Sequence, residues 1–136
     1  MNFDDFNALS RPSSPNTYLV APEGFCANAV PDRTSEAYET APEALFQRIV
    51  DMIGTETGWE LTGSDSQIGA VSFVSTSKLM RYKDDIDVLV VPLEEGEPGC
   101  KLAIYSRSRV GYSDMGANRK RVLDLLERLK DRQKQL

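Results

Sequence analysis

Residues 86–108, with the sequence IDVLVVPLEEGEPGCKLAIYSRS, contain two apolar runs separated by a short polar segment. The run 86–93 is rich in valine and leucine, and the run 100–108 contains the apolar stretch Leu-Ala-Ile-Tyr at residues 102–105, so both runs favour β-strands. Residues 94–99 consist of three glutamates, two glycines and a proline, which are typical turn residues. Because so short a connection joins antiparallel strands, this stretch predicts a β-hairpin.

Two further strand-like runs precede the hairpin, at residues 58–62 and 68–77. A turn is predicted between them at residues 63–65, which read Gly-Ser-Asp. Both faces of the run 68–77 are fairly apolar, so we expect helices to cover one face of the sheet and the N-terminal segment to cover part of the other. The four runs together predict a four-stranded antiparallel meander.

Helical periodicity flanks the predicted sheet on both sides. A helix is predicted from Thr40, which has capping-box spacing to Glu43, as far as Gly54. Its apolar positions recur at helical intervals: Leu45, Phe46, Ile49, Met52 and Ile53. A second amphipathic helix is predicted from about Asp114 to near the end of the chain. Its apolar stripe consists of Val122, Leu125, Leu126 and Leu129.

Residues 1–39 are rich in Pro, Ser, Asn and acidic groups, and only residues 18–20 suggest a short extended piece. We expect residues 1–39 to form an irregular arm packed on an α+β domain of residues 40–136. A length of 136 residues suits a single domain overall. The predicted fold is therefore a two-layer α+β domain, with a four-stranded antiparallel meander, two helices and an N-terminal arm.

Composition and charge exclude several classes of function. The net charge of −5 divides into −8 over residues 1–77 and +3 over residues 78–136. A net acidic chain is a poor binder of nucleic acid, so no nucleic-acid partner is expected. No apolar stretch is long enough to span a bilayer and no signal peptide is evident, so we expect a cytoplasmic location. The two cysteines are far apart and histidine is absent, so no metal site or cofactor is expected.

The most informative segment is residues 105–121, YSRSRVGYSDMGANRKR, where the last strand meets the last helix. Strand alternation places Tyr105, Arg107 and Arg109 on one face of the sheet. Helical spacing brings Asp114, Asn118 and Arg121 onto one side of the following helix. We expect Ser113 to cap this helix and Asp114 to complement its dipole. Two elements thus bring their polar groups together.

The string SRSRVGYSDMGANRKR, residues 106–121, resembles the signature near the C-terminus of the family catalogued as domain of unknown function 1499 (DUF1499). Asp84-Asp85 and the Ser-Pro-Asn of residues 14–16 resemble two weaker landmarks of that family, in the same order. The resemblance covers roughly residues 14–130. It implies a related fold and a shared polar site at matching positions, and it carries no reaction or ligand.

Three interpretations of the polar cluster remain open from the sequence. In the first, the arginines and aspartates pair with one another and have a structural role. In the second, the arginines exceed the aspartates and leave a pocket for an anion. In the third, aspartates hold a divalent cation or act as general acid and base in a hydrolase-like enzyme. The carboxylates of that third interpretation are Asp84, Asp85, Asp87 and Asp114.

Our leading hypothesis is a non-catalytic binding or scaffold domain that recognises a small anionic ligand or a protein partner. Asp84 and Asp85 would position the arginines of its site. The short basic run of Lys78, Arg81 and Lys83 could extend this site, although such runs are usually solvated. The remaining residues of the hypothetical site are Arg107, Arg109, Asp114, Asn118, Arg119 and Arg121.

Overall fold

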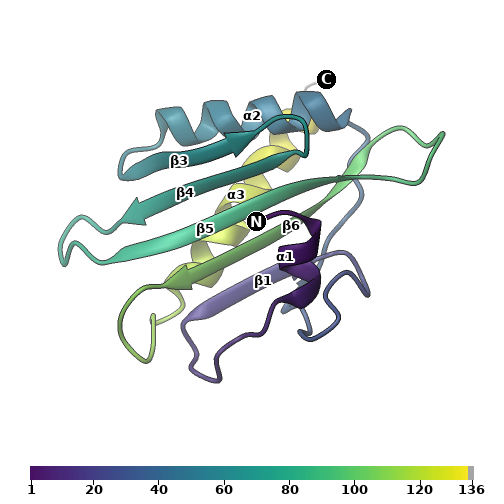
Figure 1. The fold of residues 1–136 in the computed structure, drawn as a ribbon. Coiled ribbons are helices and arrows are strands. Elements are labelled where there is room, and N and C mark those ends of the chain that lie inside the picture. Colours follow the sequence, from purple (N-terminus) through teal and green to yellow (C-terminus); the bar gives the residue numbers. More distant parts are fainter. Residues whose placement is uncertain (135–136) are drawn as a thin grey trace.

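A computed structural model describes the backbone of residues 1–134 and the side chains of residues 1–130. Within these residues the chain forms a six-stranded sheet with the order β2-β1-β6-β5-β4-β3. Figure 1 labels β1 and β3 to β6 of this sheet. The strands are β1 Thr17–Ala21, β2 Arg33–Thr34, β3 Trp59–Asp65, β4 Ala70–Thr76, β5 Lys83–Pro92 and β6 Cys100–Ser108. The helices are α1 Phe3–Ala8, α2 Pro42–Thr55 and α3 Ala117–Lys134.

The predicted meander is confirmed, because β3 to β6 pair antiparallel in sequence order. The β5–β6 hairpin keeps one register along its whole length, from Asp84 opposite Ser108 to Pro92 opposite Cys100. The predicted turn at residues 63–65 is wrong, because β3 continues through Asp65. A bulge between Leu61 and Gly63 accommodates the glycine inside the strand. The chain reverses after Asp65 instead.

The prediction of an irregular N-terminal arm and a four-stranded sheet is also wrong. β1 pairs antiparallel with β6 and parallel with β2, which makes the sheet mixed and six-stranded. The physical reason is that β6 would otherwise present an unpaired edge to solvent. Leu19, Val20 and Ala21 are buried against this edge. A capping box between Asn2 and Asp5 begins the short helix α1.

The two faces of the sheet are covered differently. α2 and α3 cover one face, while α1 lies on the other (Figure 1). The apolar stripe predicted for α2 is buried as expected, but the helix begins at Pro42 with Ala41 in the N-cap position rather than Thr40. α3 begins at Ala117, three residues after the predicted start at Asp114. Among the described residues, the helices are too short or too polar to cross a membrane.

The β5–β6 turn generates a prediction about Gly99. Gly99 has φ +98°, and a Cβ at this position would overlap the carbonyl oxygen of Tyr38. The backbones of Tyr38 and Cys100 also exchange two hydrogen bonds, of 2.7 and 3.0 Å. We expect Gly99→Ala to lower the free energy of unfolding by about 3 kcal/mol, through backbone strain and the overlap. Urea denaturation measures this change.

Gly96 provides the matched control in the same turn. It has φ +86°, but no atom lies within 4 Å of a Cβ built there. Gly96→Ala should therefore cost only about 1 kcal/mol, the left-handed conformation alone. Equal destabilisation by the two substitutions would show that the contact with Tyr38 is unimportant.

Candidate functional site

The sheet divides the predicted polar cluster into two networks, one on each face. Neighbouring strand residues point to opposite faces, so Asp84 and Asp85 are separated although they adjoin in sequence. Asp84 interacts with Arg121 of α3 on the helix-covered face. Asp85 interacts with Arg109 on the face that carries α1. The predicted gathering of arginines and mid-chain aspartates therefore exists as separate pairs rather than as one site.

The network on the helix-covered face centres on the Asp84–Arg121 pair. The Arg121 guanidinium donates to the Asp84 carboxylate at 2.7 Å, and the two side chains are only 14% and 10% exposed. The same guanidinium donates to Oδ1 of Asn118 at 3.0 Å and to Oγ of Ser106 at 3.2 Å. Because charged hydrogen bonds are strong at low exposure, this pair connects the start of α3 to the start of β5.

Asn118 is fully buried and extends this network to the N-terminal segment. Its Nδ2 donates to the carbonyl oxygen of Asn16 at 3.0 Å and to the Asp114 carboxylate at 2.7 Å. The Asn16 side chain in turn donates to the carbonyl oxygen of Gly111 at 2.8 Å. Residues 14–16, which the resemblance singled out, thus adjoin residues 106–121 in space, the segment that we call the motif.

Asp114 takes the capping role that the sequence suggested for Ser113. Its carboxylate accepts the backbone N–H of Gly116 at 2.8 Å and that of Asn118 at 3.1 Å. The Ser113 hydroxyl accepts the N–H of Met115, before the helix begins. Burial alone would raise the pKa of Asp114, but hydrogen bonds from Asn118 and the Gly116 backbone lower it below its usual value. Asp114 is therefore an ionised cap.

The network on the other face is a pair of diagonal ion pairs between β5 and β6. Asp87 lies opposite Tyr105 but pairs with Arg107 at 2.6 Å. Asp85 lies opposite Arg107 but pairs with Arg109 through two hydrogen bonds of 2.9 Å. Each carboxylate thus reaches two residues along the partner strand, a contact that long side chains can make.

Both carboxylates of these diagonal pairs have lowered pKa values. Burial would raise the pKa of Asp87, but hydrogen bonds from Ser72 and Arg107 lower it. The Met1 amino group also contacts Asp87 at 3.1 Å. The hydrogen bonds from Arg109 lower the pKa of Asp85. Arg107 further stacks over the Tyr105 ring at 5.0 Å from its centroid, so its guanidinium is held on two sides.

Arg119 differs from the other three arginines of the motif. Its side chain is exposed, and this side chain has no hydrogen-bond or ion-pair partner in the described part of the chain. It borders an open cleft that also includes Asp114 and the Arg11–Asp32 pair, whose atoms are 2.6 Å apart. Lys78 and Arg81, in the β4–β5 loop, are likewise exposed without such a partner among the described residues.

The β4–β5 loop (residues 77–82) and the β6–α3 loop (residues 109–116) lie at one end of the sheet (Figure 1). A pocket of about 330 Å³ lies between them. We call it the loop pocket. Its charged lining consists of Asp84, Asp114 and Arg121, so its interior is not an anion site by charge. The other lining residues are Ser77, Tyr82, Ser108, Val110, Gly111, Ser113 and Ala117.

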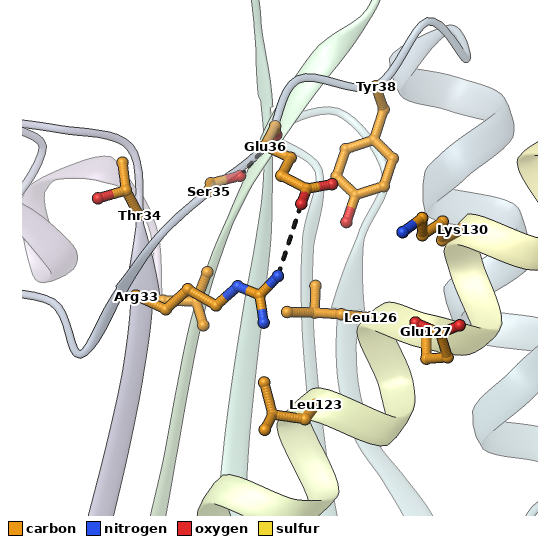
Figure 2. Close-up of a pocket in the computed structure, with 10 residues that line it drawn as sticks. Arg33, Thr34, Ser35, Glu36, Tyr38, Leu123, Leu126, Glu127 and Lys130 are labelled. Carbon is orange, nitrogen blue, oxygen red and sulfur yellow. Dashed lines mark hydrogen bonds and ion pairs between the residues drawn. The ribbon is translucent and has the colours of Figure 1, made fainter.

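A second cavity, of about 150 Å³, lies between α3 and the segment that begins with β2 (Figure 2). Figure 2 shows the Arg33–Glu36 pair, 3.5 Å apart, near Leu126 of α3. Burial raises the pKa of Tyr38, also in this cavity, to about 12, so its hydroxyl stays protonated. The charges of Arg33 and Lys130 are balanced by two glutamates. None of the predicted site residues lies here.

No group of three or more Cys, Asp or Glu residues in the described chain is arranged to hold a metal ion. The aspartates considered as metal ligands from the sequence instead accept hydrogen bonds from arginines, from Asn118 or from backbone N–H groups. The arrangement can fix loops and helix ends, and it leaves a few cations unpaired.

Comparison with known proteins agrees with the motif. A family model described as "Protein of unknown function (DUF1499)" matches residues 9–129. The match includes residues 14–16, Asp84-Asp85 and residues 106–121, which carry the two networks. A search of curated proteins found no match.

The difference between Arg119 and Arg121 gives a direct test of structural roles. Arg121→Ala would leave the Asp84 carboxylate buried without its cation. We expect it to lower the free energy of unfolding by about 3–5 kcal/mol. Arg119→Ala, two residues away on the same helix, should change it by less than about 0.5 kcal/mol. Thermal and urea denaturation of both variants measure this, and similar stabilities would contradict the assignment.

The Asp87 carboxylate predicts a specific dependence of stability on pH. Its pKa is lowered in the folded protein, so its stabilisation is complete above the unfolded value of about 4 and is lost as pH falls through the folded value. Asp87→Asn should be less stable at pH 7 by about 2 kcal/mol, because Arg107 loses its partner. It should also lose less stability than the parent protein when the pH falls from about 5 to 2.

Urea denaturation across this pH range measures the effect, with Asp4→Asn as a control on the exposed surface. An unchanged pH slope in Asp87→Asn would mean that Asp87 is not ionised by its partners in the way we describe.

Proposed function

We propose, from the premise that this chain belongs to the DUF1499 family, that it is a non-catalytic binding module for an anionic ligand or partner. The proposed binding surface is the end of the sheet formed by the β4–β5 and β6–α3 loops. We call it the loop end. The buried arginine–aspartate pairs act beneath it as a scaffold.

The observation that carries this proposal is the unpaired positive charge at the loop end. Lys78, Arg81 and Arg119 are exposed and unpaired within the described chain, whereas the motif's carboxylates all accept hydrogen bonds. Residues 77–85 and 109–121 together hold seven Lys or Arg and three Asp, while the rest of the chain holds nine and eighteen acidic residues. This local net charge of +4 on an acidic protein favours an anionic partner at the loop end.

The proposal divides the hypothetical site into two groups with different roles. Arg107, Arg109 and Arg121 are neutralised by carboxylates, so they hold the strands and α3 in place. Asp84 and Asp85 position two of these arginines. Asn118 and Asp114 fix the β6–α3 loop. Arg119 and the cations of the β4–β5 loop therefore bind the anionic ligand.

Catalysis is less well supported than binding. A general base works best with a pKa near the working pH, but the pKa values of Asp85, Asp87 and Asp114 are all lowered. Each of these carboxylates is also occupied by hydrogen-bond donors. A nucleophilic serine would need an adjacent base, and the serine of the helix-side network, Ser106, donates to the amide oxygen of Asn118.

Titration with sodium pyrophosphate at low ionic strength tests the proposal. We expect saturable chemical-shift changes in residues 77–83 and 113–120, weakened by added NaCl because exposed charges are screened. The triple variant Lys78→Ala, Arg81→Ala, Arg119→Ala should bind at least about tenfold more weakly, since each lost contact with an anion is worth about 0.5 kcal/mol or more.

A matched control removes three other cations, Arg33, Lys101 and Lys130, two of which line the cavity in Figure 2. This control should bind pyrophosphate like the parent protein. If the control loses binding and the loop-end variant keeps it, the proposed surface is wrong. If no anion titration gives a saturable response in the parent protein, anion binding itself is wrong.

A further inference from the structure

Large apolar side chains are exposed at the loop end to an unusual degree. Six of the ten exposed large hydrophobic residues among those described lie in the β4–β5 and β6–α3 loops. Leu79 is 89% exposed and Met115 is 93% exposed. The others are Met80, Tyr82, Val110 and Tyr112. Clustered apolar exposure of this kind marks an interaction surface rather than an ordinary solvated one.

Basic residues are interleaved with these apolar side chains. The β4–β5 loop and the first residue of β5 have the sequence SKLMRYK over residues 77–83, with three cations and no acidic residue. Lys120 lies one helical turn after Ala117, which lines the loop pocket. The opposite end of the sheet carries the β5–β6 turn, with three glutamates in residues 94–97 (Figure 1). The molecule is therefore electrically polarised along its strands.

The β4–β5 and β6–α3 loops have defined conformations that neighbouring groups hold in place. Arg81 and Met115 are the non-glycine residues with positive φ in the described chain, at 60° and 55°. Such conformations cost free energy and persist where neighbouring structure fixes them. Asn118 and Asp114 hold the β6–α3 loop, and the N–H of Arg109 donates to the carbonyl oxygen of Lys83 at 3.2 Å beside the β4–β5 loop.

We infer that the loop end is a docking surface for an anionic lipid bilayer. This inference rests on the proposed function and specifies its anionic partner. Leu79, Met115 and their apolar neighbours enter the boundary between headgroups and acyl chains, while Lys78, Arg81 and Arg119 contact lipid phosphates. Interfacial tyrosines and a basic surface are the combination that anionic membranes attract. The acidic β5–β6 turn faces away from the membrane.

The arrangement favours a bilayer over a protein or a nucleic acid. The apolar groups project from two separate loops, and a fluid bilayer accepts such projections without a complementary surface. A protein interface requires close packing over its core. Nucleic acid would use the cations, but fully exposed aliphatic side chains such as Leu79 and Met115 add nothing to phosphate contacts. The aliphatic residues therefore distinguish the partners.

Co-sedimentation with vesicles tests the inference on the intact chain. We expect the protein to bind vesicles of phosphatidylcholine that contain about 30% phosphatidylglycerol, an anionic lipid. It should bind little to vesicles of pure phosphatidylcholine. The double variant Leu79→Ser, Met115→Ser should partition roughly tenfold more weakly. Lys78→Ala with Arg81→Ala should weaken partitioning by roughly fivefold per cation. Because these residues are exposed, the variants should have the same melting temperature as the parent protein in thermal denaturation.

Phe3→Ser with Val30→Ser is the matched control, because it removes two exposed apolar side chains outside the loop end. It should bind vesicles like the parent protein. Equal binding by the Leu79, Met115 variant overturns membrane docking, and so does a parent protein that ignores anionic vesicles.

Pyrophosphate titration of the same samples separates the two proposals. If the protein binds pyrophosphate through Lys78, Arg81 and Arg119 but does not bind vesicles, the proposed anion site is supported and membrane docking is wrong. A protein that binds neither refutes both. Vesicle binding that depends on the cations but is indifferent to Leu79 and Met115 also refutes docking by apolar insertion.

Discussion

The structure depends on the buried side-chain amide of Asn118. This group has no exposed surface, and its donors and acceptor all find partners: Asn16, Ser108 and Asp114 on one side, Ser106 and Arg121 on the other. An unsatisfied polar group at such a position would cost a large part of a domain's stability. Three segments distant in sequence must therefore keep one relative arrangement. These segments are residues 14–16, residues 106–121 and Asp84, which joins the network through Arg121, and all three lie within the range that the family model matches.

The same constraint determines which charges remain available. A buried aspartate such as Asp84 needs a cation, and Arg121 supplies it from α3 while donating to Asn118 as well. Across the sheet, Arg107 pairs with the buried Asp87, and Arg109 pairs with Asp85 at the more exposed surface. A motif rich in arginine thus presents little free positive charge of its own. The surplus belongs to residues outside the pairs, and among the described residues Arg119 and Lys120 are the members of the motif that contribute to it.

Much of the fold could be predicted from sequence periodicity, and the failures have identifiable causes. The β5–β6 hairpin and the buried faces of α2 and α3 follow from alternation and helical spacing. β1 gave little signal because it is short and buried on both faces, so its residues do not alternate. β2 has only two residues and depends on β1 for its existence. The turn after β3 was misplaced because a bulge can absorb the glycine of a Gly-Ser-Asp sequence.

The residues of the candidate site could be predicted from the sequence, but the way in which they pair with one another could not. Asp84 and Asp85 were grouped by adjacency, although strand geometry already requires them to face opposite ways. The pairing of Asp87 with Arg107 needed the register between β5 and β6, which no local pattern contains. The short basic run of the β4–β5 loop gives no signal in the sequence alone, because only the fold brings this loop and the β6–α3 loop together around one pocket. The chemistry of this surface arises from two loops that only the completed sheet places at one end.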